Sequence, residues 1–313
     1  MTSVVEAPER AAGERRARRL NGRGIARQAR ASRRLRTKRR EAVTRAVVTY
    51  VLLIAGGVIL LIPFAWLVST SLKPPTEVYA FPIVWIPHPA MWDNYVQVFQ
   101  QSPFARYLLN TAIITSIGVI ASLTGSSIAA YAFARMEFRG KRVMFAVMLA
   151  TLMVPIWTVL IPTYIFFEKI GWLNTYLPIL VPAFFATPFN TFLMRQFFLT
   201  IPLELEESAR VDGASRWYTF VRIILPLARP ALLIISIFAF FYYWNEFLLP
   251  LLYIQSQDLL PVSVGVSNFV ASQQVNFPLE MAASAIAIAP PLILFFVFQR
   301  WFIQGIVVSG VKG

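Results

Sequence analysis

The sequence predicts an all-α membrane protein with six transmembrane helices. Hydrophobic residues make up 57% of the 313-residue chain and charged residues 14%, whereas soluble domains carry about 25% charged residues. The mean hydropathy is +0.61. Six apolar runs reach the roughly 20 residues that a helix needs to cross the hydrocarbon core of a bilayer. They are Val47–Val68, Tyr107–Phe133, Val143–Phe167, Tyr176–Phe198, Ala231–Tyr253 and Ala282–Ile303.

A basic arm precedes the first apolar run. Fifteen of the 29 lysines and arginines lie before Ala46, together with four acids, so most of the net charge of +14 belongs to this arm. It has no apolar period with which to bury a core, and we expect residues 1–44 to be disordered and cytoplasmic. We favour contact with anionic membrane lipid, and a role in setting topology, over nucleic-acid binding.

The distribution of positive charge sets the orientation. An even number of spans puts both termini on one side, and cytoplasmic loops carry the excess of lysine and arginine. With the termini inside, 26 lysines and arginines lie in the cytoplasm and three lie outside, at Lys73, Arg106 and Lys169. We therefore expect the N-terminus and the C-terminus to face the cytoplasm.

Segments outside the membrane separate the predicted spans. Residues 72–103 form a loop rich in proline, tryptophan and tyrosine, which suits the outer membrane interface. Lys169–Asn174 is a short outer loop, and Ile254–Met281 is a long polar one. We divide the chain into the arm (1–44), the first span with its outer loop (45–104), a core of five spans (105–304) and a C-terminal tail (305–313).

A polar insert at 201–229 separates the fourth and fifth predicted spans on the cytoplasmic side. Pro202 suits the first turn of a helix, and Gly213 can adopt the positive φ that ends one. Ser215 can then cap a second helix, which Pro226 and Pro230 end. The apolar residues of that second helix recur at helical spacing, and they are Trp217, Phe220, Val221 and Ile224. The insert therefore predicts a helix, a sharp turn and a second helix across the inner face of the bundle.

The insert also carries a spaced pattern: Glu-x-Ala, a glycine four residues after the alanine, nine further residues, and then Ile-x-Leu-Pro. This pattern resembles the EAA loop of permease subunits in ATP-binding-cassette (ABC) importers, with Ser208 in place of the usual second small residue. The resemblance implies a coupling helix that a separate ATPase grips. The residues it implies for coupling are Glu207, Ala209, Asp212, Gly213, Ala214, Ile223, Leu225 and Pro226.

Five short segments extend the resemblance over the chain from about Arg45 to the C-terminus. They are similar to the carbohydrate-importing branch, most closely to its maltose-permease (MalG-like) subunits. The fold this implies is the MetI-like permease fold of type I ABC importers, in a bacterial cytoplasmic membrane. The segments are Ser71–Pro74, Trp92–Tyr95, Asn110–Thr111, Trp244–Phe247 and Gly310–Gly313.

The resemblance also implies the partners and the mechanism. The partners are a second permease subunit, two ABC ATPase subunits, an extracytoplasmic sugar-binding protein and the transported sugar. ATP and Mg²⁺ would be bound by the ATPases, and this chain would hold no cofactor. Closure of the ATPases on ATP would move the coupling helix and turn the bundle from inward-open to outward-open. Ile254–Met281 is then the expected contact for the binding protein, and Gly310–Gly313 for the ATPases.

One acid lies well inside an apolar run. Glu246 is about seven residues from the outer end of the fifth span, or roughly 10 Å deep, and charges within a span are usually functional. Aromatic faces with amide and carboxylate acceptors suit a sugar. The predicted substrate path is therefore Tyr243, Trp244, Asn245 and Glu246, with Asn190 from the fourth span. An internal strut between spans is the alternative, and the sequence leaves both interpretations open.

Prolines are frequent in the third and fourth spans. Within a membrane they are tolerated where protein or a water-filled path satisfies the freed backbone groups. A gate, a kink and simple packing are all compatible with them. They are Pro155, Pro162, Pro178, Pro182 and Pro188.

Other activities lack the residues they need. The sequence has no G-x-x-x-x-G-K-[ST] loop, so we expect no ATPase activity of its own. It has no cysteine and one histidine, His88 in a proline-rich loop, so we expect no metal site and no catalytic residues. Two alternatives to the permease remain: an ion-coupled secondary transporter that uses Glu246, and a non-transporting membrane scaffold.

Overall fold

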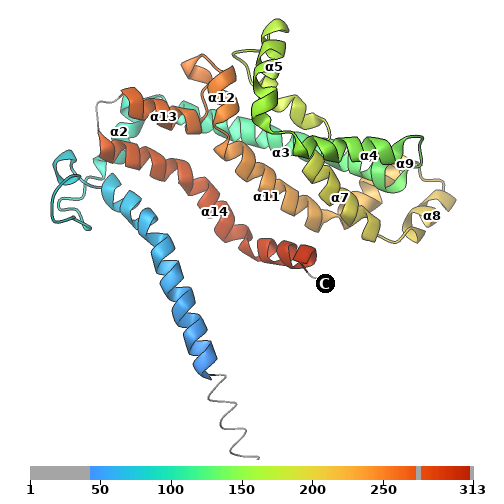
Figure 1. The fold of residues 1–313 in the computed structure, drawn as a ribbon, viewed down its shortest axis with the longest axis horizontal. Helices are drawn as coiled ribbons and strands as arrows, with labels where there is room; N and C mark the ends of the chain where they lie inside the picture. The colour runs from blue at the N-terminus through green and yellow to red at the C-terminus, as the bar shows by residue number, and fades with distance from the viewer. Residues whose placement is uncertain (1–42, 273–275, 311–313) are drawn as a thin grey trace, which may run out of the picture. The chain divides into compact units, whose positions relative to one another are not determined.

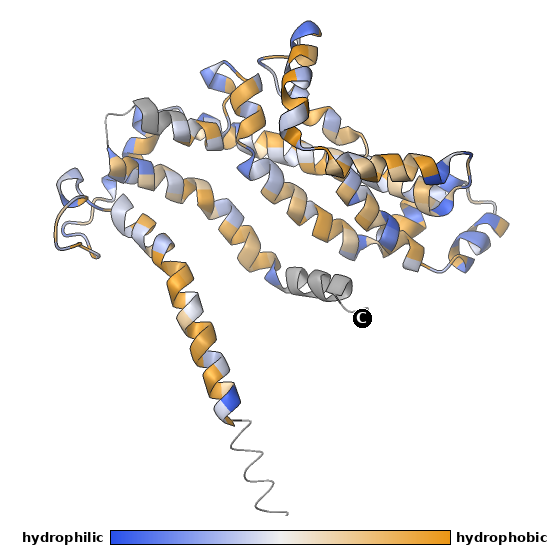
Figure 2. Ribbon diagram, in the orientation of Figure 1, coloured by the Kyte–Doolittle hydropathy of each residue, from blue (hydrophilic) through white to orange (hydrophobic). Residues whose placement is uncertain are grey.

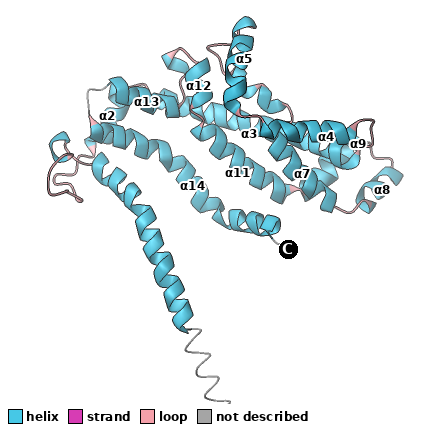
Figure 3. Ribbon diagram, in the orientation of Figure 1, coloured by secondary structure: helices cyan, strands magenta, loops and turns pink. Residues whose placement is uncertain are grey.

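The computed structural model describes residues 43–272 and 276–310, and their regular elements are all helices (Figure 3). By its contacts the chain divides into two units, 1–65 and 66–313. Residues 66–104, which the sequence analysis groups with the first span, thus belong to the larger unit. The predicted arm lies almost wholly outside the described residues, as do the last three residues of the predicted tail.

The first unit contains most of the helix Val43–Ser71, which encloses the first predicted span. Every side chain from 43 to 65 is exposed or half-buried, and the apolar residues occur all round the helix. A helix that is apolar on every side is stable in lipid rather than in water.

The second unit is an assembly of helices, which Figure 1 labels and Figure 2 colours by hydropathy. Its elements up to the fourth span are η1 (Pro75–Glu77), α2 (Asp93–Gln101), α3 (Phe104–Arg135), α4 (Lys141–Ala150), η2 (Thr151–Met153), α5 (Ile156–Lys169), α6 (Leu177–Leu180), η3 (Pro182–Phe184) and α7 (Pro188–Thr200). The later elements are α8 (Glu204–Val211), α9 (Arg216–Thr219), the π-helical η4 (Phe220–Ile224), α10 (Leu225–Leu227), α11 (Arg229–Asn245), α12 (Leu248–Tyr253), η5 (Gln257–Leu259), α13 (Val262–Ser272) and α14 (Phe277–Gly310).

Four helices in the described residues are long and apolar enough to cross a membrane, or up to six if two bent pairs each count as one span. The third predicted span is one of these pairs, because the chain turns by 102° between Lys141–Met153 and Ile156–Lys169. Pro155 lies at that break, where its missing N–H cannot continue the helix. Of the interpretations that the prolines left open, the third span thus has a sharp kink at Pro155.

The fifth predicted span also differs from the structure. The helix α11 ends at Asn245, and the last residues of the predicted span form the separate helix α12. At its N-terminal end, α11 meets the segment Arg216–Leu227 at an angle of 78°.

The predicted outer segment Ile254–Met281 contains η5, α13 and the start of α14, which the sequence analysis did not anticipate. Side chains of α3 hold this segment in place. The Asn110 amide donates to the carbonyl oxygens of Asp258 and Leu260 at 2.8 and 2.9 Å, and the Thr111 hydroxyl accepts from the Val262 N–H at 2.7 Å. Long-range bonds of this kind are invisible in a local hydropathy pattern.

Two segments that carry the family resemblance, Ser71–Pro74 and Trp92–Tyr95, lie against each other. The Asn94 amide donates to the carbonyl oxygens of Ser71 and Lys73, and the Ser71 and Tyr95 hydroxyls lie 2.7 Å apart. The Lys73 side chain is fully buried, with its ammonium nitrogen 4.2 Å from the centre of the Trp66 ring. The predicted loop 72–103 is thus tied down at both ends.

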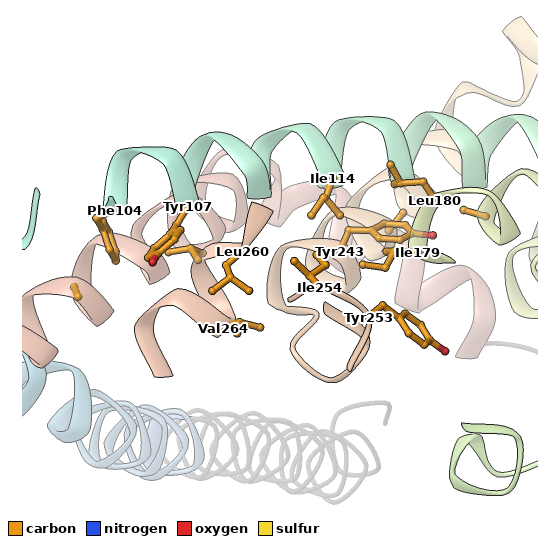
Figure 4. Close-up of a cluster of buried hydrophobic side chains, with 14 of the residues drawn as sticks. Phe104, Tyr107, Ile114, Ile179, Leu180, Tyr243, Tyr253, Ile254, Leu260 and Val264 are labelled. Atoms are coloured by element: carbon orange, nitrogen blue, oxygen red, sulfur yellow. The ribbon is translucent and has the colours of Figure 1, made fainter. Parts of the chain in front are cut away.

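The helix α3 lies at the centre of the unit and packs along both α7 and α11. Two buried clusters flank it. The larger contains Tyr107, Ile114 and Tyr243 (Figure 4), and the smaller contains Met194, Phe198 and Ile224. The smaller cluster supports the polar insert between α7 and α11.

Candidate functional site

The polar insert folds as a short helix, a tight turn and a second short helix, as predicted. Gly213 has φ +82°, and its N–H donates to the Arg210 carbonyl at 3.1 Å. The next N–H, of Ala214, donates to the Ala209 carbonyl at 2.9 Å. The Ser215 hydroxyl accepts from the Tyr218 N–H at 3.2 Å and so caps α9. The predicted helix end and helix cap are both confirmed.

The second helical segment ends between Pro226 and Pro230, as predicted. After α9 the chain passes through the π-helical η4 and the three-residue α10 before it bends into α11. Pro226 lies in α10, which ends at Leu227, and Pro230 lies in α11, which begins at Arg229. Neither proline can donate a backbone hydrogen bond, which favours a bend at this place.

The predicted coupling residues divide between an exposed surface and the face that packs on the bundle. Ala209 is buried, and the residues of intermediate exposure are Ala214, Ile223 and Leu225. Those exposed to solvent are Glu207, Asp212, Gly213 and Pro226.

Large apolar side chains accompany the exposed acids. Val211 is 87% exposed and Trp217 63% exposed, and Tyr218 is exposed beside them. We call the set Glu207, Val211, Asp212, Trp217 and Tyr218 the α8–α9 surface. Phe220 does not belong to it, because that ring is buried against Tyr131 and Phe198. Exposed tryptophan and tyrosine beside acids are typical of a surface that binds another protein.

One buried acid was missed by the sequence analysis. The Glu206 carboxylate forms an ion pair with Arg135, with 2.9 Å between Oε1 and Nε, and the Tyr131 hydroxyl donates to its Oε2 at 3.1 Å. Both charged side chains are more than nine-tenths buried. The sequence does hold a signal for this, because Glu206 lies three residues before the buried Ala209 and therefore on the same helix face.

A cavity of about 570 Å³ lies at the other end of α7. Two of the five residues predicted for the substrate path, Asn190 and Tyr243, line it. The lining residues come from α3, the segment 178–190, α11 and α12, and they are Ser122, Pro178, Ile179, Pro182, Ala183, Ala186, Thr187, Pro188, Phe189, Asn190, Phe238, Ala239, Tyr242, Tyr243 and Leu249.

Two features shape this cavity. Three of the prolines singled out in the sequence belong to its wall, namely Pro178 in α6, Pro182 at the start of η3 and Pro188 at the start of α7. Tyr243 lies so close to α3 that a Cβ on Gly118 would be 2.6 Å from its ring. Figure 4 shows Tyr243 and Ile179 together beside α3. The lining combines aromatic rings with hydroxyl and amide groups and contains no charged side chain.

The other three residues predicted for the substrate path lie outside the cavity lining. The Trp244 indole N–H donates to the Ala287 carbonyl of α14 at 3.0 Å. The exposed Asn245 amide donates to the Phe241 carbonyl of its own helix. Glu246 follows α11, and its Oε1 accepts from the Leu249 N–H at 3.0 Å at the start of α12. Each of these three side chains thus has a contact within the protein.

No group of three or more histidine, cysteine, aspartate or glutamate side chains that could hold a metal ion occurs within residues 43–272 and 276–310.

Comparison with known proteins shows that residues 119–308 match the family described as binding-protein-dependent transport system inner membrane component. The diacetylchitobiose uptake system permease protein NgcG of Streptomyces coelicolor is 32% identical over 82% of this chain and 85% of its own length. The trehalose/maltose transport system permease protein MalG of Thermococcus litoralis is 31% identical over 88% of this chain and 99% of its own length.

A solved structure is similar as well. It is a chain of a bacterial ABC transporter involved in the import of the acidic polysaccharide alginate. The TM-score is 0.75 at 26% sequence identity, over 82% of this chain and 96% of that chain. The likeness extends beyond local helical pattern to the arrangement of the helices.

Proposed function

The chain belongs to the family of inner-membrane components of binding-protein-dependent transport systems, and from that premise we propose that it is the permease subunit of an ATP-driven importer of a sugar or oligosaccharide. The α8–α9 surface is the observation that carries the proposal. A rigid turn presents exposed acids and aromatic rings, and a buried ion pair fixes the helix behind them. This surface is the handle on which a separate ATPase acts.

The coupling residues divide into two roles. Those that are exposed, Glu207 and Asp212 together with the turn at Gly213, contact the ATPase. The buried and half-buried ones hold the turn on the bundle, and they are Ala209, Ala214, Ile223 and Leu225, with Pro226 at the bend that follows. An ATPase can shift the bundle between two states only if it binds this surface differently in each.

The cavity beside α7 belongs to the path of the sugar. Tyr242, Tyr243 and Phe189 offer flat faces to the C–H surfaces of a sugar ring, and Asn190 and Ser122 offer hydrogen bonds to its hydroxyl groups. The absence of charge from the lining suits an uncharged glycan. Trp244 and Asn245 support this wall from the same helix, and Glu246 fixes the start of α12, whose Leu249 also lines the cavity.

The assembly contains the partners that a binding-protein-dependent system requires. They are a second permease subunit, two ATPase subunits that bind ATP and Mg²⁺, and an extracytoplasmic sugar-binding protein. The protein lies in the bacterial plasma membrane, with its termini and the α8–α9 surface in the cytoplasm. The excess of lysine and arginine supports this orientation. The segment Ile254–Met281, whose first residues are held by α3, contacts the binding protein.

Reconstitution tests this function. The chain is expressed with candidate partner subunits, purified in detergent, and placed in liposomes with the binding protein and radiolabelled neutral oligosaccharides. We expect stoichiometric ATPase subunits and ATP-dependent uptake, and we expect Glu207→Arg to abolish uptake while the protein still inserts. Uptake by this chain alone, driven by an ion gradient without ATP, would indicate a secondary transporter. Absence of uptake in every combination would indicate a scaffold.

A further inference from the structure

The buried ion pair between Arg135 and Glu206 joins three parts of the protein. Arg135 is the last residue of α3, and Glu206 lies in α8. The Nη2 atom of Arg135 also donates to the carbonyl oxygens of Phe198, at 2.6 Å, and Ile201. One guanidinium group therefore binds the end of α3, the end of α7 and the helix α8 at a single junction.

The junction contains a buried charge pair, which anchoring alone does not require. A buried ion pair commonly stabilises a fold no better than apolar side chains of similar volume, because both charges must leave water. Removal of one partner is far more costly, because it leaves the other charge buried and unpaired. The carboxylate is held from a second side by the Tyr131 hydroxyl, which donates to Oε2 at 3.1 Å. The arrangement thus ties α8 to the ends of α3 and α7.

Two helices run from this junction to the cavity. The first three residues of α7 line the cavity, and Phe198 near its other end contacts Arg135. On α3, Ser122 lines the cavity and Arg135 forms the junction. At 1.5 Å per residue, α3 spans roughly 20 Å between Ser122 and Arg135, and α7 spans roughly 12 Å between Asn190 and Phe198. The two helices pack against each other.

We propose that Arg135 and Glu206 are positioning residues for energy coupling, which make α8, α7 and the inner half of α3 move as one body. A displacement of α8 then becomes a displacement of the cavity wall. Glu207, the next residue, is exposed and meets the ATPase, whereas Glu206 transmits the movement inward. This role rests on the proposed function, because it presupposes an ATPase that pushes on α8.

Glu206→Gln in the complete reconstituted assembly tests the proposal. The substitution keeps the shape of the side chain and removes the charge that pairs with Arg135. We expect ATP hydrolysis close to that of the wild type, with sugar uptake per ATP lowered about fivefold or more, the lower end of typical couplings between sites. Arg135→Lys keeps the charge and loses the planar guanidinium group, so its sugar uptake per ATP hydrolysed should lie between those of the wild type and Glu206→Gln.

The matched control is Glu137→Gln, which removes the same charge from an exposed pair with Lys141, two residues beyond α3. The wild-type and control assemblies should both show ATP-dependent uptake, with equal amounts of sugar taken up per ATP hydrolysed. If neither assembly takes up sugar, the proposed function itself fails, and this outcome is distinct from failure of the coupling role. If both transport and Glu206→Gln has the wild-type ratio, the coupling role is overturned. It is overturned also if uptake and hydrolysis fall in proportion.

A distance measurement covers the case in which the variant does not assemble. The chain has no native cysteine, so spin labels can be attached to cysteines introduced at Leu199 of α7 and Glu204 of α8, both exposed. The distance between the two spins should be the same in the ATP-free and ATP-bound assembly with Arg135 and Glu206 intact. A change in that distance on ATP binding would show that α8 moves independently of α7 and would refute the proposal.

Discussion

Substitution of Gly213 separates the shape of the coupling turn from its chemistry. The residue has φ +82°, and no heavy atom lies within 4 Å of the position that a Cβ would take. Gly213→Ala therefore meets no clash and costs only the strain of the left-handed conformation, about 1 kcal/mol. This corresponds to a roughly fivefold lower population of the native turn. Asparagine tolerates the same conformation and should cost less.

Proline is a far larger perturbation at this position. Its φ is fixed near −65°, roughly 150° from the observed value, and it lacks the N–H that now donates to Arg210. We expect ATP-dependent uptake in liposomes to be close to that of the wild type for Gly213→Asn, to fall at most about fivefold for Gly213→Ala, and to be lost for Gly213→Pro. Membrane insertion should be unaffected in all three.

Gly140 provides the matched control, because it has φ +79° and an equally open Cβ position at the start of α4. Gly140→Ala introduces the same strain outside the α8–α9 surface and should leave uptake unchanged. Equal losses for the two alanine variants, or normal uptake by Gly213→Pro, would show that the turn has no special part in coupling.

Three further substitutions test the packing and the buried charges. Gly125→Ala should lower the unfolding temperature in detergent by roughly 5 °C, because the new Cβ would stand 2.2 Å from the Phe184 carbonyl oxygen and overpacking outweighs the gain in helix propensity. Gly56→Ala, whose new Cβ would have no atom within 4 Å, should leave the unfolding temperature unlowered. Equal unfolding temperatures for the two variants would contradict the clash. Burial lowers the pKa of the Lys73 ammonium below 10.5, so the folded protein releases that proton at a lower pH than the unfolded chain does. The free energy of unfolding should therefore rise as the pH approaches 10.5. A series of thermal unfolding measurements should show this rise in the wild type and not in Lys73→Met, and a rise that persists in the variant would exclude Lys73 as the cause. Glu246→Gln keeps an acceptor for α12 and should retain uptake, whereas Glu246→Ala should cost about 1 kcal/mol of stability; loss of uptake in the glutamine variant would favour an ion-coupled role.

Features that depend on a few neighbouring residues could be predicted from the sequence. The apolar runs located the membrane helices, since about 20 apolar residues in a row have few other stable environments. Gly213 and Ser215 marked the helix end and the helix cap, because positive φ and side-chain capping are local properties. A kink at Pro155 was one of the interpretations that the sequence left open, because a hydropathy pattern alone does not distinguish a straight helix from a broken one.

Which polar side chains are buried, and which groups they bind, could be learned only from the tertiary structure. Glu206 and Glu207 are adjacent and chemically identical, yet one is buried and the other is exposed. The difference arises from Arg135 and Tyr131, the latter 75 positions away along the chain. Glu246 looked equally suited to a sugar or to a strut, and the structure shows its Oε1 on the Leu249 N–H.

The amino-acid sequence by itself determined which long segments are apolar enough for lipid and where the tight turn of the polar insert lies, because these follow from side-chain pattern and backbone sterics within a few residues. Only the tertiary structure decided that α3 and α7 join one buried ion pair to the cavity, and that Asn190 and Tyr243 share its wall. Burial of a charge and closure of a cavity depend on groups that are distant in the chain, and their free energies arise only when those groups meet.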